Sequence, residues 1–181
     1  MDFSHYSTDP VDLAIALVNS SEEPGQALAS LDDLNAFLDG YETLWDGVAR
    51  PPAAKDLDGA RRLKEALREV IASPDNETAA TRINEILSDH GAEPRVSYHN
   101  GSPHLHFEPV GSKMIDWLGA ITAMGLASVI VDHGIDRFGV CAASTCNDVY
   151  IDTSRNRSRK NCSSTCSTRE AVAAYRKRQA G

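Results

Sequence analysis

Apolar side chains recur every three or four residues in four stretches of the first ninety positions, which is the spacing of one helix face. Thr8 or Asp9, Ser30 and Asp75 stand where three of these helices would begin, and their side chains suit helix N-caps. Gly40 and Gly91 follow the last apolar residues of two stretches, where helices commonly stop. The pattern therefore predicts four amphipathic helices that begin near residues 10, 31, 57 and 76.

The apolar spacing then changes to alternate positions. Val96 and Tyr98 precede the pair Asn100-Gly101, and Leu105 and Phe107 follow it. Alternation on both sides of an Asn-Gly pair is typical of two antiparallel strands joined by a tight turn. This stretch predicts one β-hairpin.

The 15 residues from Trp117 to Val131 carry no charge. A membrane-spanning helix needs about 20 apolar residues, and Thr122 and Ser128 interrupt this run. We therefore expect a buried helix that Ser112 opens and that ends near Gly134. Because it is apolar nearly all round, we predict that the other helices pack against it.

Charge divides the 181 residues into two parts, although the chain as a whole carries a net charge of −8. Residues 1–136 hold 9 Lys/Arg and 23 Asp/Glu, a net charge of −14, whereas residues 137–181 hold 9 basic and 3 acidic residues, a net charge of +6. All four cysteines lie in the second part. We predict a mostly helical α+β protein, with a helical domain (1–136) that carries one hairpin and a small treble-clef-like zinc finger (137–181).

The first twelve residues are not typical of a signal peptide, because no basic run precedes their short apolar stretch. We therefore expect a cytoplasmic location without membrane association. Thiols stay reduced there, so clustered cysteines favour a metal over disulfides.

The acidic part offers little catalytic chemistry. His99, His104 and His106 could approach one another across the hairpin as a metal site, but no carboxylate follows at a ligand-like spacing, and a solvated polar face is favoured. No glycine-rich phosphate loop or nucleophile elbow occurs in the sequence. We expect no enzymatic activity.

The cysteines follow the pattern Cys141-x4-Cys146-x15-Cys162-x3-Cys166. Two close pairs separated by a loop can present four thiolates to one tetrahedral zinc ion. Buried thiols without a ligand, or disulfide and redox chemistry, remain alternatives, but the segment has few apolar residues to form a core. We predict one structural Zn²⁺ bound by these four cysteines.

Basic residues alternate with these ligands. Four lie between the two cysteine pairs and three lie in the helix predicted after the last cysteine: Arg155, Arg157, Arg159, Lys160, Arg169, Arg176 and Arg178. Such a cluster is typical of phosphate binding, so we predict that these residues contact nucleic acid, and DNA is the expected partner. Docking of the basic segment against the acidic domain of the same or another chain is the alternative.

The segment from Cys141 to Arg178 resembles the CGNR zinc-finger family. Its core D-x-S-R-N-x-S-R occurs here as Asp152, Ser154, Arg155, Asn156, Ser158 and Arg159. In that family a four-cysteine, treble-clef-like finger follows a helical ABATE domain, which is proposed to regulate transcription under stress. The resemblance implies a zinc-dependent, DNA-binding bacterial regulator.

The sequence departs from the family at the name-giving motif, which reads Cys166-Ser167-Thr168-Arg169 here, and at Asn161, where the family usually has Trp. The metal ligand and the arginine are retained. We expect zinc binding to be unaffected, whereas a contact through the family's Asn or Trp is not available to this chain.

Two functional hypotheses follow from these observations. In the first, the protein is a transcription regulator that binds DNA through the finger, and its N-terminal domain senses a small-molecule effector or forms a homodimer. In the second, the chain is a zinc-stabilised protein-interaction module that does not bind nucleic acid.

Overall fold

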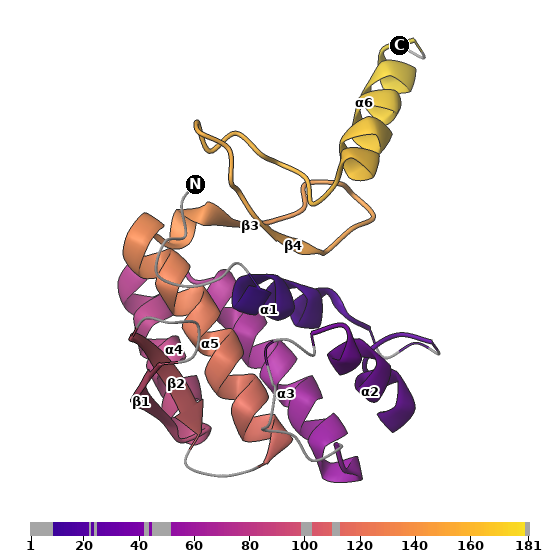
Figure 1. Cartoon of the computed structure of the whole chain (residues 1–181). Helices are drawn as coiled ribbons and strands as arrows, with labels where there is room; N and C mark the ends of the chain where they lie inside the picture. The colour runs from indigo at the N-terminus through magenta and orange to yellow at the C-terminus, as the bar shows by residue number, and fades with distance from the viewer. Residues whose placement is uncertain are drawn as a thin grey trace.

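The computed structural model describes residues 9–21, 23, 25–41, 44, 52–98, 103–109 and 113–179. Five helices and one hairpin form the body of the molecule, and the cysteine-containing segment lies on one end of it (Figure 1). The architecture is mostly helical, with a small antiparallel hairpin and a C-terminal cysteine cluster, as the sequence predicts.

The helices of the body are α1 (Asp9–Asn19), α2 (Leu31–Asp39), α3 (Ala54–Ile71), α4 (Asn76–Asp89) and α5 (Met114–His133). Strands β1 (Ala92–Ser97) and β2 (His104–Pro109) pair antiparallel between α4 and α5. A short 3-10 turn, η3 (Ile135–Arg137), leads to strands β3 (Phe138–Val140) and β4 (Val149–Ile151), and α6 (Ser164–Gln179) follows.

Polar side chains define several helix starts. The Ser30 hydroxyl accepts a hydrogen bond from the Asp33 N–H, and the Asp75 carboxylate accepts one from the Thr78 N–H, so two of the three predicted N-caps are confirmed. For the third, Asp9 is the first residue of α1, and Thr8 lies outside the described residues. Helix α3 begins three residues before the predicted Leu57, because the Asp56 carboxylate accepts a hydrogen bond from the Ala53 N–H and stabilises an earlier first turn. Ser112 lies outside the described residues, and α5 begins after Lys113 without a side-chain cap.

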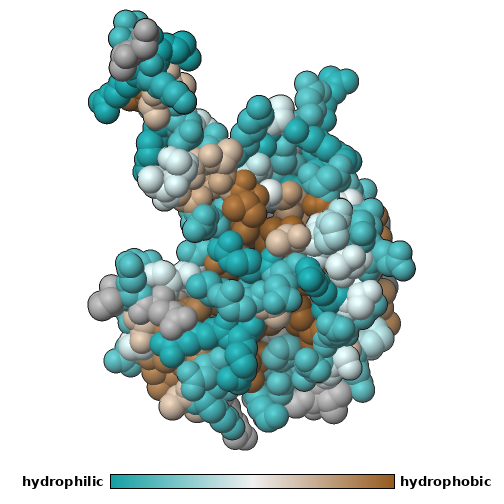
Figure 2. Space-filling view, turned by 180° about the vertical axis from the view of Figure 1, so that it is seen from behind, coloured by the Kyte–Doolittle hydropathy of each residue, from teal (hydrophilic) through white to brown (hydrophobic). Residues whose placement is uncertain are grey.

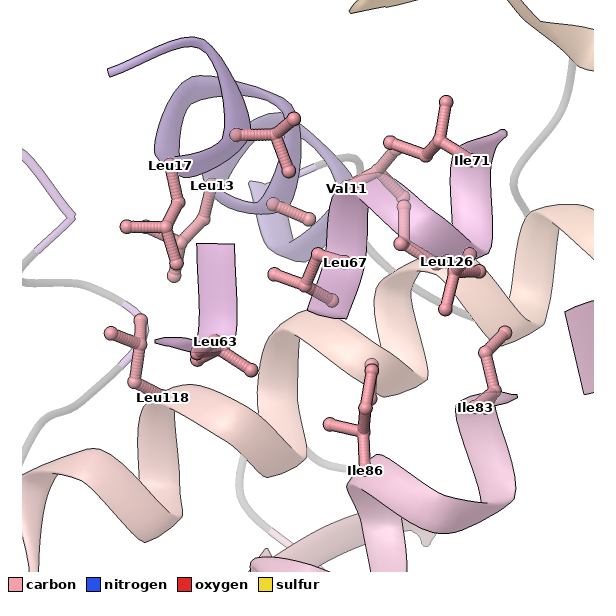
Figure 3. Packing of buried hydrophobic residues seen from close by; sticks show 14 of the residues in the cluster. Val11, Leu13, Leu17, Leu63, Leu67, Ile71, Ile83, Ile86, Leu118 and Leu126 are labelled. Carbon is pink, nitrogen blue, oxygen red and sulfur yellow. The ribbon is translucent and has the colours of Figure 1, made fainter. Parts of the chain in front are cut away.

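Helix α5 is the centre of the helical core, as its all-round apolar sequence predicts. It packs against α1, α3, α4 and the hairpin, and its length and composition would also suit a membrane span, but most of it is buried in the protein. Figure 3 shows Leu118 and Leu126 of α5 facing side chains from the other helices. At the crossing with α1, a Cβ on Gly125 would lie 2.8 Å from the backbone of Pro10, so only glycine permits this approach.

The predicted hairpin is confirmed by the pairing of Ala92 with Pro109 through Ser97 with His104. Its turn at Asn100-Gly101 lies outside the described residues, as does His99. The structure describes the backbone of His104 and His106 but not their side chains. The three-histidine hypothesis therefore stays untested.

The connection between the body and the cysteine-containing segment is held in place by a sharp turn, a hydrogen bond and apolar packing. Gly134 adopts φ +86°, a conformation that favours glycine, and turns the chain sharply after α5. The next N–H, of Ile135, donates a 2.7 Å hydrogen bond to the Asn76 side chain. Phe138 of β3 and Val149 of β4 then pack into the same hydrophobic cluster as the helices.

Candidate zinc centre and its basic surroundings

The four cysteines come from separate parts of the finger and converge on one point. Cys141 follows β3, Cys146 precedes β4, Cys162 ends the loop after β4, and Cys166 lies in the first turn of α6. All four Sγ atoms lie within 4.8 Å of one another. Cys162 Sγ is 3.6 Å from Cys146 Sγ and 3.7 Å from Cys166 Sγ.

These spacings fit a tetrahedral zinc ion. Zn–S bonds of about 2.3 Å place the sulfur atoms of a regular tetrahedron about 3.8 Å apart. The finger thus carries a four-cysteine cluster consistent with one structural Zn²⁺, as predicted from the cysteine pattern. When bound, the ion would neutralise the thiolates and cross-link the two cysteine pairs, and four protein ligands leave no open position for substrate.

Hydrogen bonds to sulfur prepare Cys141 to act as a thiolate ligand. The Cys162 N–H and the Asn161 side-chain amide donate to Cys141 Sγ over 3.4 and 3.7 Å. Burial alone raises the pKa of the Cys141 thiol, but donors that include these two groups and the Ala143 N–H outweigh it and lower the pKa to about 6. At Cys162, burial and the adjacent thiol of Cys146 raise the pKa of the thiol instead.

Asn161, which replaces the family's usual Trp, thus has a role of its own. Besides its bond to Cys141, its side-chain oxygen accepts a hydrogen bond from the Ser167 hydroxyl over 3.3 Å. Ser167 is itself a departure from the family motif. The two unusual residues therefore contact each other beside a metal ligand.

The loop between the cysteine pairs is organised by buried Asp152. Its two carboxylate oxygens accept hydrogen bonds from the N–H groups of Ser154 and Arg159, each at 2.8 Å. The Ser154 hydroxyl accepts a further bond from the Ser158 N–H. Burial raises the pKa of Asp152, but these donors, with help from Arg137, outweigh it and hold the pKa below its ordinary value. Four residues of the D-x-S-R-N-x-S-R motif therefore build the loop.

Arg159 belongs to this scaffold. Its guanidinium donates hydrogen bonds to the carbonyl oxygens of Ile151, Asn161 and Cys162, and it lies 5.0 Å from the centre of the Tyr150 ring. The Tyr150 hydroxyl in turn donates to the Arg159 carbonyl oxygen over 2.7 Å. A side chain with this many internal partners is positioned to stabilise the cysteine loop, a role that its basic charge alone does not indicate.

Arg157 and Arg169 are also engaged. Arg157, at φ +50°, forms an ion pair with Asp136 and donates a hydrogen bond to the His133 carbonyl oxygen at the end of α5. Arg169 donates to the Thr145 hydroxyl over 2.9 Å. Arg157 thus joins the finger to the acidic domain, and Arg169 joins α6 to the first cysteine pair.

Arg137 donates hydrogen bonds to the carbonyl oxygens of Asp152 and Ser154. The remaining basic residues of the finger are exposed and have no hydrogen-bond or ion-pair partner among the described residues. They are Arg155 and Lys160 in the loop, and Arg176, Lys177 and Arg178 on α6. The three acidic side chains of the finger face elsewhere: Asp148 contacts the Cys162 thiol, Asp152 holds the loop, and Glu170 accepts from Ser144. In Figure 2, α6 is a hydrophilic projection separated from the body by a notch.

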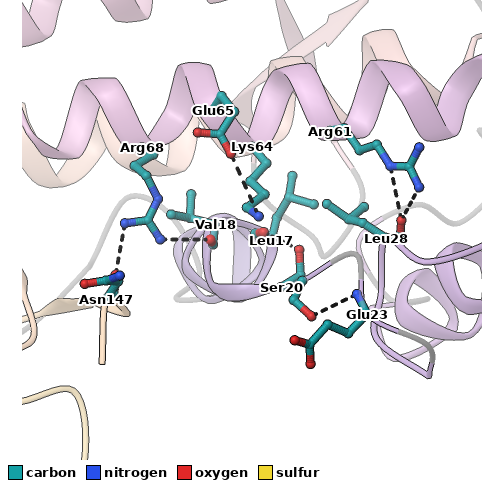
Figure 4. Close-up of polar contacts among 11 residues, drawn as sticks. Leu17, Val18, Ser20, Glu23, Leu28, Arg61, Lys64, Glu65, Arg68 and Asn147 are labelled. Atoms are coloured by element: carbon teal, nitrogen blue, oxygen red, sulfur yellow. Dashed lines mark hydrogen bonds and ion pairs between the residues drawn. The ribbon is translucent and has the colours of Figure 1, made fainter. Parts of the chain in front are cut away.

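Two residues that sequence reasoning missed hold the finger on the body. The Asn19 side chain donates to the Val149 carbonyl oxygen over 2.9 Å and accepts from the Val149 N–H over 2.7 Å. The Arg68 guanidinium bridges the carbonyl oxygens of Asn147 and Val18 (Figure 4). Both sit on helix surfaces where a polar residue is ordinary, so only the spatial proximity of β4 indicates their role.

The helical domain has a pocket of its own, of about 480 Å³, between α3, the end of α4 and the start of α5. Leu63, Ile86 and Ile115 form apolar parts of its lining. Asp56 Oδ1 and His90 Nδ1 are buried there without a hydrogen-bond partner among the residues that the structure describes, although Asp116 Oδ1 lies 3.5 Å from His90 Nδ1. Unpaired buried polar atoms in a pocket of this size are what a small ligand or water could satisfy.

Two family models match the chain. Residues 11–133 match ABATE, described as "Putative stress-induced transcription regulator", and residues 137–179 match the CGNR zinc finger. No curated protein shows significant similarity to the chain.

Proposed function

Because the chain belongs to the ABATE family and carries a CGNR zinc finger, we propose that it is a transcription regulator that binds DNA through the finger. Zinc holds the finger together, and the helical domain supplies regulation by sensing a small effector or by forming a homodimer. A homodimer would suit this task, since one finger of this size buries too little DNA surface for high affinity alone.

The free cations of the finger are the observation that carries this proposal. Arg155, Lys160, Arg176, Lys177 and Arg178 are exposed, and no acidic side chain of the finger pairs with any of them. Unpaired cations bind phosphates without first breaking an internal ion pair, and each contact releases counterions from DNA. The finger is therefore prepared electrostatically for a polyanion even though the whole chain is acidic.

The pocket of the helical domain supports the sensing role. It combines apolar walls with two buried atoms, Asp56 Oδ1 and His90 Nδ1, that have no hydrogen-bond partner among the described residues. A compound with an apolar body and a hydrogen-bonding group would satisfy these atoms. One end of α5 lines the pocket and the other end leads into the finger. A structural change caused by ligand binding in the pocket would therefore be transmitted to the finger through a single helix.

The proposal is tested by mobility shifts of the zinc-loaded full chain on duplex DNA at low salt. We expect retention of the DNA that weakens steeply as salt is raised. The double variant Arg155→Ala, Lys160→Ala should reduce the slope of log affinity against log salt by about 1.8, since each phosphate contact contributes about 0.9. Absence of any retention at low salt, with zinc content verified, would contradict DNA binding.

The second candidate is a protein-interaction module. It is favoured by the ion pair between Arg157 and Asp136, because this pair shows a finger arginine already bound to an acidic protein surface. In that case the protein would be retained on an acidic partner in pull-downs, and the DNA experiment would be negative.

A further inference from the structure

Helix α6 is the most exposed element of the described structure. Among its 16 residues only Cys166 is buried, and Glu170 is half-buried. The helix extends away from the helical body and projects into solvent (Figures 1 and 2). Sixteen residues form a rod about 24 Å long. A helix that packs so little of its surface gains little from the rest of its own chain, so a partner is expected to cover it.

The free face of α6 has a definite composition. At 100° per residue, Cys166 points toward the finger, and the opposite side carries Thr168, Ala171, Tyr175 and Gln179, with Val172 beside them. Tyr175 is 57% exposed and Val172 42% exposed. Arg178 flanks this stripe on one side and Arg176 on the other. The face thus consists mainly of small or aromatic side chains, with Gln179 at its end, and two guanidinium groups without a partner among the described residues border it.

Charge selects among possible partners. The only acidic residue of α6 is Glu170, which accepts a hydrogen bond from the Ser144 N–H. The basic residues Arg169, Arg176, Lys177 and Arg178 make the helix strongly basic. Two such helices from two copies would repel each other, so a pair of α6 helices is disfavoured. The occupant must instead be anionic.

The geometry of the finger also places α6, and not the cysteine loop, in the position to make specific contacts with a partner. Arg157 is bound to the body and Arg159 to the Cys162 carbonyl oxygen, so two of the loop's four cations are already used. The remaining loop cations, Arg155 and Lys160, lie on a segment held closely by Asp152. The loop can approach phosphates, but only α6 projects far enough to enter a groove.

We propose that α6 is the recognition element of the finger and lies in the major groove of duplex DNA. The inference rests on the proposed DNA-binding function. The major groove is about 12 Å wide and admits one α-helix. Tyr175 and Thr168 offer hydroxyl groups to base edges, Ala171 and Val172 are small enough to approach thymine methyl groups, and Arg176 and Arg178 reach the phosphates on the two sides.

The experiment uses the zinc-loaded full chain and a pool of random 30-base-pair duplexes. The DNA that the protein retains is sequenced, and binding to an enriched duplex is compared with binding to a scrambled duplex of the same composition. Tyr175→Ala tests base reading without a change of charge. Its matched control is Val131→Ala, another exposed side chain (83% exposed), which lies on α5 and not on α6. Zinc content and helicity are measured for every variant.

We expect Tyr175→Ala to weaken binding to the enriched duplex by about 10-fold or more, in the range of a lost base contact, with an unchanged salt slope. Binding to the scrambled duplex should barely change, and Val131→Ala should behave as the wild type. Methyl green, which occupies the major groove, should displace the protein, whereas the minor-groove ligand netropsin should not.

Charge variants separate the two basic surfaces. Arg176→Ala, Arg178→Ala should weaken binding and alter the enriched sequences, because the helix loses its orientation in the groove. Arg155→Ala, Lys160→Ala removes the same charge and should weaken binding equally on all sequences.

Three results would overturn the inference. Tyr175→Ala could bind as the wild type, the random pool could yield no enriched sequence, or only the loop variant could lose affinity. In each case the protein still binds DNA, so the proposed function survives while α6 loses its assigned role. If the wild-type protein binds no DNA but captures an acidic protein through α6, both proposals fail together.

Discussion

In the helical domain, leucines from several helices, including Leu13, Leu17, Leu67, Leu118 and Leu126, are withdrawn almost completely from solvent, and they form one continuous cluster. Among the described residues of the finger, the only separate cluster of buried residues consists of Cys141, Ala143 and Cys166. One part of the molecule is stabilised by apolar area, and the other by thiolates, a buried carboxylate and its attachment to the first part. The two parts of the chain, with net charges of −14 and +6, therefore differ in what stabilises them as well as in charge.

Removal of zinc should have the largest effect on stability, and it should affect the finger but not the helical domain. Structural zinc sites of this class contribute about 10–16 kcal/mol of apparent binding energy, which is also folding energy. Chelation, or Cys162→Ser, should therefore unfold residues 137–179 and leave the helical domain intact. Limited proteolysis with metal analysis tests this, with about one zinc per chain expected. A finger that resists protease without zinc would contradict the comparison.

Leu67→Ala should destabilise the helical domain instead. Leu67 is fully buried in α3, and its truncation leaves a cavity that we expect to cost about 2–5 kcal/mol of unfolding free energy. Zinc stoichiometry should stay unchanged, because no cysteine contacts this part of the core. Denaturant unfolding measures the loss, and the exposed Val131→Ala serves as its control. An equal loss in both variants would refute the assigned core.

The junction between the parts is tested by Asn19→Ala. This change removes the two hydrogen bonds to Val149 and should cost about 1–3 kcal/mol, since it leaves a backbone N–H and C=O unpaired. Asn35→Ala is a matched control, because Asn35 is a half-buried helix residue that makes no hydrogen bond through its side chain in the described structure. Hydrogen exchange should show faster exchange at β4 in the first variant only. Unchanged protection would mean that the finger is not held through Asn19.

The ion pair across the junction predicts a smaller effect. Both partners are exposed, so Asp136→Asn should change stability by less than about 1 kcal/mol. It would, however, remove the ion-pair partner of Arg157 and leave only its hydrogen bond to the His133 carbonyl oxygen, so the salt slope of DNA binding should become steeper by about 0.9. Asp132→Asn removes a neighbouring exposed charge and leaves Arg157 paired, so its slope should stay unchanged. Identical salt slopes for the two variants would show that the ion pair with Asp136 does not prevent Arg157 from contacting DNA.

The smallest effect is expected at the N-cap of α4. The hydrogen bond from the Thr78 N–H lowers the pKa of Asp75, so this carboxylate stabilises the folded state above the ordinary pKa of an aspartate and loses that contribution as the pH falls through the lowered pKa. Asp75→Asn keeps a capping side chain without the charge. The difference in melting temperature between wild type and Asp75→Asn should therefore be small at pH 7 and vanish in acid, whereas Asp75→Ala should melt lower at every pH.

The helices of the body were predictable because their signals are local. Ser30 and Asp75 cap the helices that they precede, and the apolar spacing of α3 alone identifies Leu63 and Leu67 as buried. The error at the start of α3 arose because the capping partner of Ala53 is Asp56, three residues into the helix, whereas an alanine gives no sign of a cap.

The zinc centre was predictable for a different reason. Metal ligands must be cysteines or a few other residue types at short spacing, so the pattern from Cys141 to Cys166 restricts the geometry by itself. The basic residues carry no such restriction. An arginine suits a phosphate, a carbonyl oxygen or an aspartate equally well. Only the folded chain shows that Arg159 holds the loop, that Arg157 holds the junction and that Arg155 has no partner among the described residues.

The contact between Asn19 and Val149 has one more consequence, which concerns association between molecules. A two-stranded sheet exposes unpaired backbone groups along both outer edges, and such edges invite strands from other chains. At β4 the Asn19 amide satisfies the N–H and C=O of the outward-facing residue, as a further strand would. The helical domain thus shields the edge of the finger's sheet and leaves less of it available to start aggregation in a crowded solution.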